Sequence, residues 1–581
     1  MSKDVILSNG IVYDPANGID GEVKDICITD GKIVDKVSEK AKKINVSGKT
    51  VLPGGVDMHS HIVGSKVNFG RAMCPEQTKY GPPVARTKVT RSGVGGIIMS
   101  SYSLGYKYSS MGYTTVIEPA LPPMKALGTW EELEDIPNLN TALLPMFGNS
   151  MITYNYVKEG DISGLSGYIS WLLRATGGWG VKVVNPGGTY AWAYGKNVRE
   201  PDTEIPDWGI TPREVIRSLV KATESLGLPH VVHLHPNNLG RVGNVHTTME
   251  ELDAVKDIKG HKGRKHTIHL THMSFETLDM VDDGKPQWKD VASGGLTFAK
   301  YMNKNKHFTA DMGQITFGPA MTMTGDGPFQ FTLHQMTQTK WANIPVDVEL
   351  PGGAGIVPYY FDMKSPANSV QWTIPLEFAL SVDDIWRVIM TTDHPNAGPF
   401  TKYPLVLSWL MSKAQRDIWL EKVHKFARER SVLESIEREW SIYEIAISTR
   451  AAPAKILGIE KRKGHLGIGA DADVSVYDMN PLKTELAKKP ELIVKGFSES
   501  ALTILSGEVV AKKGIVTKSS HGKVMTLEAT LNEDLAGRTE KEIENMITNW
   551  YSHQFRNYSV PERYRAPLEE KIKLDSRSVP A

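Results

Sequence analysis

Hydrophobic and polar positions alternate in short runs at both ends of the chain. The first part, residues 1–52, alternates β-branched runs with Asn-Gly and Asp-Gly pairs, a pattern typical of β-hairpins. The same alternation returns at 464–480 and 503–516. The two ends therefore predict one small β domain, formed from residues 1–52 and 456–520.

The middle of the chain has a different pattern, in which apolar runs of strand length alternate with amphipathic helical stretches such as 213–227. This is the pattern of βα units around a parallel sheet or barrel. The predicted strands are 114–120, 180–186, 230–236, 266–274, 308–317 and 388–395. A chain of 581 residues exceeds one ordinary core, but a (β/α)₈ TIM-like barrel with insertions can occupy most of it. We therefore predict an α/β protein with this barrel at 53–455 and a charged, aromatic docking arm at 521–581.

Composition excludes several classes of protein. With 67 Lys and Arg against 66 Asp and Glu, the net charge is +1, so no global field would draw the protein to nucleic acid. No run reaches the ~18 apolar residues of a membrane span, and the first residues lack the pattern of a secretory signal. The only cysteines, Cys27 and Cys74, exclude a disulfide framework and a cysteine-held iron–sulfur cluster within this chain, and they fit a reducing cytoplasm.

The stretch GGVDMHSHI places His59 and His61 one residue apart in an apolar run. Alternate side chains of a strand share a face, so Asp57, His59 and His61 are expected to project together, and two imidazoles can hold one metal ion. Taken alone, this motif is more commonly a strand end with two hydrogen-bonded histidines. Metal binding therefore requires ligands from elsewhere in the chain.

Lys182 lies between valines in GVKVVNP, where burial disfavours the ammonium and lowers the lysine pKa. A neutral amine can capture CO₂ as a carbamate, an anionic group able to bridge two metal ions. The alternative is a lysine that extends to solvent or pairs with a carboxylate, the commoner fate of such a residue.

Further predicted strands end in polar side chains. VVHLHP offers His233 and His235, IHLTHMS offers His269 and His272, and their spacing leaves open which histidine of each pair is a ligand. Asp393, in TTDHP, is either a loop cap or a metal ligand and general base beside water activated by zinc. The order H-x-H, Lys, His, His, Asp at successive strand ends is far more specific than any member, and barrel enzymes build their sites from such ends.

This ordered set resembles the amidohydrolase superfamily with a binuclear metal centre, which includes dihydroorotases and hydantoinases. The resemblance implies that the β domain is a β-sandwich, and it favours the second histidine of each pair. It also implies two zinc ions bridged by carboxylated Lys182, with Asp393 as the catalytic base. The metal ligands implied by the resemblance are His59, His61, Lys182, His235, His272 and Asp393.

Longer motifs, such as WLLRATGGWGVKVVNPGG and TTDHPNAGPFTKYP, resemble the A subunits of archaeal formylmethanofuran dehydrogenases over nearly the whole chain. That resemblance implies reversible condensation of formate with the amine of methanofuran. It also implies partner subunits with a tungsten or molybdenum pterin and iron–sulfur clusters, because this chain lacks a redox-cofactor motif. One departure is that Ser274 and Glu276 stand where the family has amide and imidazole groups, so the family's substrate contacts at that loop are not carried over to this chain.

Three alternatives remain open at this point. The first is the related formyltransferase/hydrolase complex, which uses the same site for hydrolysis, and the second is a stand-alone cyclic amidase. The third is a metal-free relative with a structural role, against which all six ligand positions are filled by competent residues.

Overall fold

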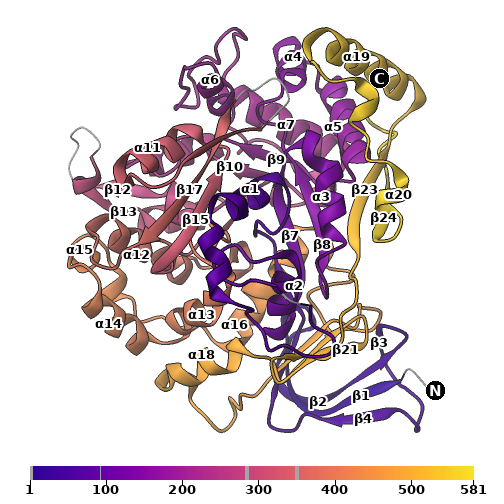
Figure 1. Ribbon diagram of the computed structural model, residues 1–581, viewed down its shortest axis with the longest axis vertical. Helices are drawn as coiled ribbons and strands as arrows, with labels where there is room; N and C mark the ends of the chain where they lie inside the picture. Colours follow the sequence, from indigo (N-terminus) through magenta and orange to yellow (C-terminus); the bar gives the residue numbers. More distant parts are fainter. Residues whose placement is uncertain (1–3, 92, 282–286, 347–351, 581) are drawn as a thin grey trace.

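The computed structural model describes residues 4–91, 93–281, 287–346 and 352–580 (Figure 1). Strands from residues 5–53 and 474–516 share one nine-stranded sheet, at the lower end of that view. Its strands are β1 (Val5–Asp14), β2 (Ile19–Thr29), β3 (Lys32–Val34), β4 (Lys42–Asn45), β5 (Thr50–Pro53), β19 (Val474–Tyr477), β20 (Leu502–Leu505), β21 (Glu508–Lys512) and β22 (Ile515–Val516). Strands β5 and β19 join the two halves as an antiparallel pair, and the sheet has an apolar core of its own.

Two parallel five-stranded sheets form the middle of the protein. One has the order β18-β14-β11-β10-β9 and the other β24-β23-β8-β7-β6. Isolated parallel bridges, Met146 to Lys182 and Ser60 to His394, link strand ends of one sheet to strand ends of the other. The strands that supply or precede the site are β6 (Gly55–Asp57), β7 (Tyr113–Leu121), β8 (Asn140–Pro145), β9 (Lys182–Val184), β10 (Val232–His235), β11 (Ile268–Leu270), β14 (Phe308–Asp311) and β18 (Val388–Ile389).

Each strand predicted in the middle of the chain is present, but several are shorter than their apolar runs. Strand β11 ends at Leu270 and β18 at Ile389, so the chain leaves the ladder before it reaches His272 and Asp393. Both of these residues adopt positive φ, 37° for His272 and 48° for Asp393, which regular strands do not allow. Lys182 likewise begins β9 rather than lying inside it.

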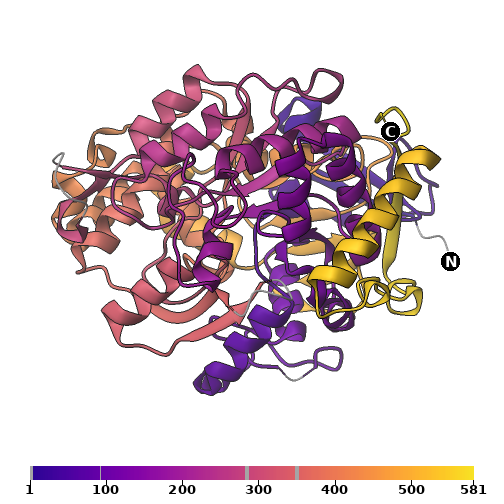
Figure 2. The same cartoon turned by 90° about the horizontal axis from the view of Figure 1, so that it is seen from above.

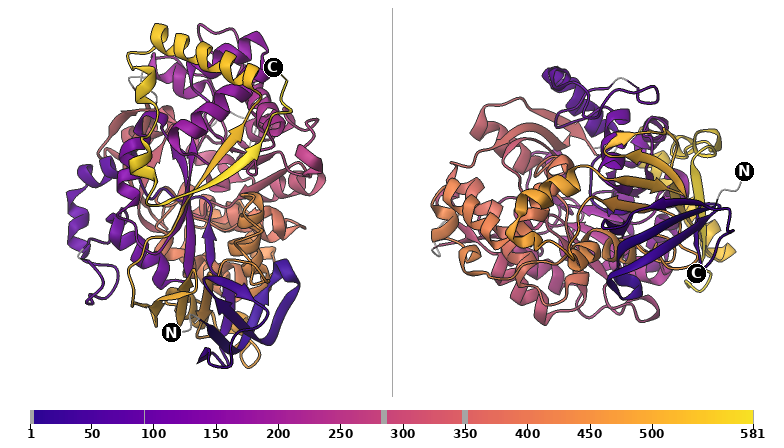
Figure 3. Two further views of the ribbon diagram at one scale, coloured as in Figure 1. Left: turned by 90° about the vertical axis from the view of Figure 1, so that its right-hand side faces the viewer. Right: turned by 90° about the horizontal axis from the view of Figure 1, so that it is seen from below.

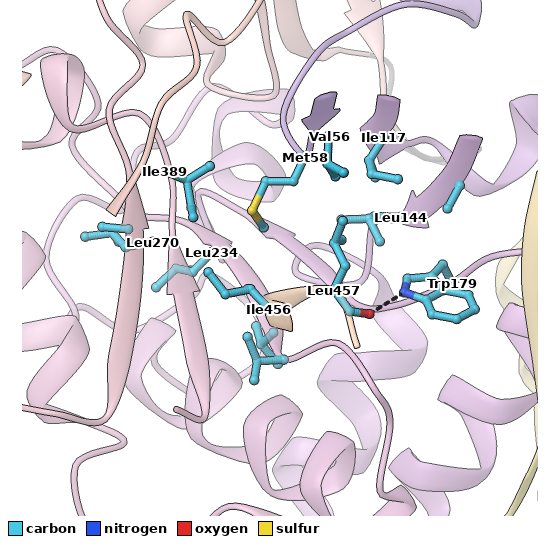
Figure 4. Close-up of a cluster of buried hydrophobic side chains, with 14 of the residues drawn as sticks. Val56, Met58, Ile117, Leu144, Trp179, Leu234, Leu270, Ile389, Ile456 and Leu457 are labelled. Carbon is cyan, nitrogen blue, oxygen red and sulfur yellow. Dashed lines mark hydrogen bonds between the residues drawn. The ribbon is translucent and has the colours of Figure 1, made fainter. Parts of the chain in front are cut away.

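Helices lie around the strands when the molecule is seen from above (Figure 2). The amphipathic stretch at 213–227 forms α7 (Pro212–Leu226), which starts at a capping box of Thr211 and Glu214 and packs on α5 (Ile162–Thr176). Inside this layer, buried apolar side chains from β6, β7, β8, β10, β11 and β18 form a cluster (Figure 4). Trp179 joins it and donates its indole N–H to the Leu457 carbonyl over 3.0 Å.

An antiparallel unit that the sequence pattern did not predict follows β14. It consists of β15 (Gly318–Thr324), β16 (Ala342–Pro345) and β17 (Gly353–Phe361), with β17 in the middle. Side chains from all three strands reach the cavity described below. This unit therefore covers part of the candidate site.

The C-terminal segment packs on the rest of this chain. Strand β23 (Val524–Thr530) pairs in parallel with β8 and with β24 (Glu569–Asp575), and Figure 3 shows both strands along one flank. Helix α19 (Glu533–Trp550) crosses α5, where Gly167 lets the Thr539 side chain approach closely. Within the described ranges, no helix combines the length and apolar character that crossing a bilayer requires.

Candidate metal centre

All six side chains named as candidate ligands line one cavity of about 40 Å³. None of them is more than 5 % exposed. They come from separate parts of the fold: the residues after β6, the start of β9, the end of β10, and the turns after β11 and β18. The six are His59, His61, Lys182, His235, His272 and Asp393.

His59 and His61 meet the Asp393 carboxylate. The distances from their Nε2 atoms to Asp393 Oδ1 are 3.1 Å for His59 and 3.2 Å for His61. Two atoms bound to one tetrahedral zinc at ~2.0–2.2 Å would be ~3.3–3.5 Å apart, so these three side chains are close to the spacing of a metal site. Asp57 does not join them, because β6 ends there and its carboxylate accepts the hydroxyl of Tyr108 at 2.8 Å.

Carboxylates also contact the Nδ1 atoms of these two imidazoles, on the side of each ring opposite to Asp393. His59 Nδ1 lies 2.8 Å from Asp311 Oδ2, and His61 Nδ1 lies 2.9 Å from Glu118 Oε1. An N–H donated from Nδ1 leaves the Nε2 lone pair free for a cation. Burial alone would lower the pKa of His59, but Asp311 and Asp393 outweigh it and raise the pKa to about 9. The two carboxylates therefore stabilise positive charge at this imidazole.

His235 and His272 form a second pair, with 3.0 Å between His235 Nδ1 and His272 Nε2. Burial lowers the pKa of His235 well below its usual range and that of His272 to about 3, so both imidazoles are neutral. Neutral imidazole is the form that binds metal ions. The left-handed backbone of His272 and Asp393 is a strained conformation of the kind that clusters at functional sites.

Lys182 is 2 % exposed at the start of β9. Burial lowers its pKa to about 7, more than the Asp393 and Asp311 carboxylates raise it. A large share of neutral amine near neutral pH is the condition that carbamate formation requires. A second lysine of the cavity, Lys66, instead pairs with Glu118 over 3.0 Å.

His233 and His269 are buried but do not line the cavity. His269 Nε2 lies 3.2 Å from Asp311 Oδ2, and His233 Nε2 lies 3.4 Å from His59 Nδ1. These two histidines therefore form a layer behind the ligand candidates.

Asp311 and Glu118, the carboxylates that contact His59 and His61, are the candidate functional residues that sequence reasoning missed. Each is a carboxylate at or near the end of a buried apolar strand, in FTAD and TTVIEP, so the signal that singled out Asp393 was also present there. Ser274 donates to the Gly313 carbonyl at 2.6 Å, and neither Ser274 nor Glu276 lines the cavity.

The described residues fit a metal centre. Candidate groups of ligand atoms within 4.8 Å of one another include His59, His272 and Asp393, and also His235, His272 and Glu276. Buried imidazole and carboxylate groups are zinc ligands. The remaining wall of the cavity is largely apolar, which is typical of a site for a small organic substrate; its apolar members include Ala120, Pro122, Met146, Val184, Leu239, Phe275 and Phe329.

Comparison with known proteins assigns the class: the chain belongs to the Amidohydrolase family, whose sequence profile matches residues 42–511. It is a metal-dependent amidohydrolase of the α/β type that this family adopts. Within this class it is 45 % identical to Protein FwdA of Methanocaldococcus jannaschii, over 99 % of this chain and 100 % of that protein, and it belongs to the same protein family.

Two further comparisons concern one bacterial complex. The chain is 34 % identical to the A subunit of the formyltransferase/hydrolase complex Fhc of Methylorubrum extorquens, over 96 % of each chain. The crystal structure of that FhcABCD complex with methylofuran has a chain that matches with a TM-score of 0.87 at 31 % identity, covering 98 % of this chain and 100 % of that one. A dihydroorotase of Elusimicrobium minutum is 48 % identical, but over only 10 % of this chain and 14 % of its own.

Proposed function

We propose that this protein is the subunit of a formylmethanofuran dehydrogenase that joins formate to the primary amine of methanofuran, giving formyl-methanofuran and water. The observation that carries this proposal is the convergence of six ligand-type side chains on one narrow cavity, in a chain similar over its full length to Protein FwdA. The methylofuran in the related Fhc complex supports a furan-linked amine as the substrate.

The proposal includes the finer features of the fold. The two parallel sheets and the bridges between them support a closed (β/α)₈ barrel at residues 53–455, made of β6 to β11 without a break in order, then β14 and β18. The nine-stranded sheet supports a β-sandwich from residues 1–52 and 456–520. Residues 521–581 form the remaining unit, packed on the barrel through β23 and α19.

We propose that these six side chains form two neighbouring zinc sites. His59, His61 and Asp393 would hold one ion, His235 and His272 the other, and carboxylated Lys182 both. Zinc bound there would supply a Lewis acid for the formyl oxygen and a water molecule of lowered pKa.

The protein's own groups handle protons and water. In hydrolysis the Asp393 carboxylate accepts a proton from the attacking water at Oδ1 or Oδ2 and passes it to the leaving amine nitrogen. In condensation it accepts the proton from the amine nitrogen and passes it to the oxygen that leaves as water. Asn396 Nδ2 lies 2.9 Å from each of these oxygens and fixes the orientation of the carboxylate. The apolar part of the cavity wall limits the entry of bulk water, which strengthens the electrostatic interactions at the reacting groups.

Formate must come from elsewhere in a complex. This chain cannot hold the iron–sulfur clusters needed to make formate, because Cys27 and Cys74 are its only cysteines and both are free thiols. We propose that partner subunits with a tungsten or molybdenum pterin and iron–sulfur clusters reduce CO₂ and deliver formate to this site. The Fhc relatives favour one second candidate: the same site used for hydrolysis beside a formyltransferase. Co-purifying subunits distinguish the two functions.

Hydrolysis of formyl-methanofuran by the zinc-loaded protein tests the reaction and the site together. Wild type should bind two equivalents of zinc and release formate, whereas Lys182→Ala should lose bound zinc and activity. Lys340→Ala is the matched control, since this lysine pairs with Glu76 on the surface. Two zinc equivalents and undiminished turnover in Lys182→Ala would overturn the assignment of the site, and an inactive zinc-loaded wild type would overturn the substrate.

A further inference from the structure

Each histidine that follows β6 has a carboxylate behind it. Asp311 lies 2.8 Å from Nδ1 of His59, and Glu118 lies 2.9 Å from Nδ1 of His61. Such carboxylates fix the tautomer and the ring orientation of imidazoles that bind metal through their other nitrogen. The second histidine pair would be expected to need the same support.

Glu276 lies behind that second pair. Its Oε1 atom is 3.6 Å from His272 Nδ1 and 4.0 Å from His235 Nε2. Helix α9 (Met273–Glu276) is a single turn that begins directly after His272, and this turn carries Glu276 back under the imidazole four residues earlier. The three side chains are almost completely buried, with exposures of 0 % for Glu276 and 3 % for each histidine.

The polar atoms that face one another in this group are buried. Among the described residues, His235 Nε2, His272 Nδ1 and both carboxylate oxygens of Glu276 make no hydrogen bond. A buried carboxylate without donors is costly, and so is a buried ring N–H without an acceptor. One small movement would satisfy all of these groups at once.

We propose that Glu276 is a positioning residue that accepts the N–H groups of His235 and His272 when these histidines bind metal. This inference rests on the proposed metal centre. If His235 binds through Nδ1 and His272 through Nε2, the atoms that face each other at 3.0 Å, the ring protons must sit on Nε2 and Nδ1. Those are the two atoms that face Glu276, and an approach of ~0.5–1 Å brings them to hydrogen-bond distance.

Glu276 does not line the cavity, so it acts through the histidines rather than on the substrate. The expected effect is therefore on metal retention. Loss of such a supporting carboxylate weakens metal binding by about 10- to 100-fold.

Zinc affinity of Glu276→Gln, measured with zinc alone against a chromophoric chelator, tests the inference. One of the two zinc equivalents should bind about 10- to 100-fold more weakly, because the neutral amide keeps only one, weaker acceptor oxygen and its NH₂ cannot accept the second ring N–H. Glu251→Gln is the matched control: Glu251 is also fully buried, but its Oε1 accepts the backbone N–H of Asn237 at 3.1 Å. Both zinc equivalents should bind to this control as they do to wild type.

Wild-type affinity for both zinc ions in folded Glu276→Gln would overturn the inference. A crystal structure of the zinc-loaded wild type decides it independently if the variant does not fold. Oxygen–nitrogen distances of about 2.7–3.2 Å from Glu276 to both histidines are expected. A Glu276 oxygen bonded directly to zinc, or a carboxylate still ~4 Å from both rings, would refute the role. Neither measurement uses methanofuran, so failure here leaves the proposed reaction standing, and an inactive zinc-loaded wild type leaves this inference standing.

Discussion

Lys182 should react with cyanate near neutral pH once the metals are removed. Cyanate carbamylates neutral amines, and it tests at the same Nζ atom the reactivity that CO₂ capture would need. The side chain is 2 % exposed, and burial lowers its pKa to about 7 against the pull of Asp393 and Asp311. Cyanate is small enough to enter a cavity of about 40 Å³.

The expected magnitude follows from the protonation equilibrium. Since the pKa of Lys182 is lowered from 10.5 to about 7, the neutral form is populated at pH values above about 7. At pH 7.5 about three quarters of Lys182 is neutral, against about one thousandth of a lysine with the ordinary value, a gain on the order of 10³. Burial of the amine slows the entry of cyanate and so reduces the advantage given by the larger neutral fraction. We expect Lys182 to be labelled at least about tenfold faster than a lysine that is paired with a carboxylate.

Peptide mass spectrometry after timed labelling of the chelator-treated protein measures this rate at each lysine. Lys66 is the internal control, because it lines the same cavity but donates to the Ala120 carbonyl at 3.0 Å and pairs with Glu118. After correction for the fraction of the reagent present as isocyanic acid, the rate constant at Lys182 should rise through a midpoint near pH 7 and then level off. Zinc-loaded protein should be protected. A midpoint near 10.5, or equal labelling of Lys66 and Lys182, would refute the argument from burial.

Three further predictions concern catalysis, packing and charge. Asp393→Asn should leave the circular dichroism spectrum unchanged and slow formyl-methanofuran hydrolysis by about 10²- to 10⁴-fold, so turnover within about tenfold of wild type would contradict its role as the base. Leu234→Ala removes a fully buried side chain of the cluster in Figure 4 and should lower the free energy of unfolding by about 2–5 kcal/mol in denaturant titrations; a loss under about 1 kcal/mol would argue against tight packing there. Burial alone would raise the pKa of Glu118, but Lys66 and His61 outweigh it and lower the pKa from 4.5 to about 2. A carboxyl group whose pKa is lower in the folded than in the unfolded protein stabilises the fold at pH values above the unfolded pKa. Glu118→Gln should therefore reduce Tm at neutral pH, and the difference in Tm from wild type should shrink as pH falls from 4.5 toward about 2. A difference in Tm that stays constant over that range would exclude the charge effect.

Local patterns predicted much of the architecture. Runs of β-branched residues around turn pairs identified the strands at both ends, and alternating apolar runs and amphipathic stretches identified the strands of the middle and the helix α7. Strand ends were less predictable. His272 and Asp393 leave their strands with positive φ, and local propensity does not indicate where a cavity pulls the backbone out of the ladder.

The sequence by itself determined which residues could serve as ligands, because imidazole, lysine and carboxylate groups in apolar runs are conspicuous. The sequence did not determine which of these candidates line the cavity and which lie behind it. His233 and His235 share a strand face, and only the three-dimensional arrangement decided that His235 lines the cavity while His233 lies in the layer behind it. Spacing alone left that choice open, and the resemblance to amidohydrolases favoured His235.

Only the tertiary structure decided what supports the ligands. Asp311 reaches His59 across 252 positions of the chain, and the antiparallel unit of β15, β16 and β17 covers a cavity that begins near β6. The physical reason is that periodicity records whether a side chain faces the core, whereas a hydrogen bond depends on two strands that meet only after the sheets have formed. Elements and candidate chemistry could therefore be predicted locally, but the pairing of each imidazole with its carboxylate could not.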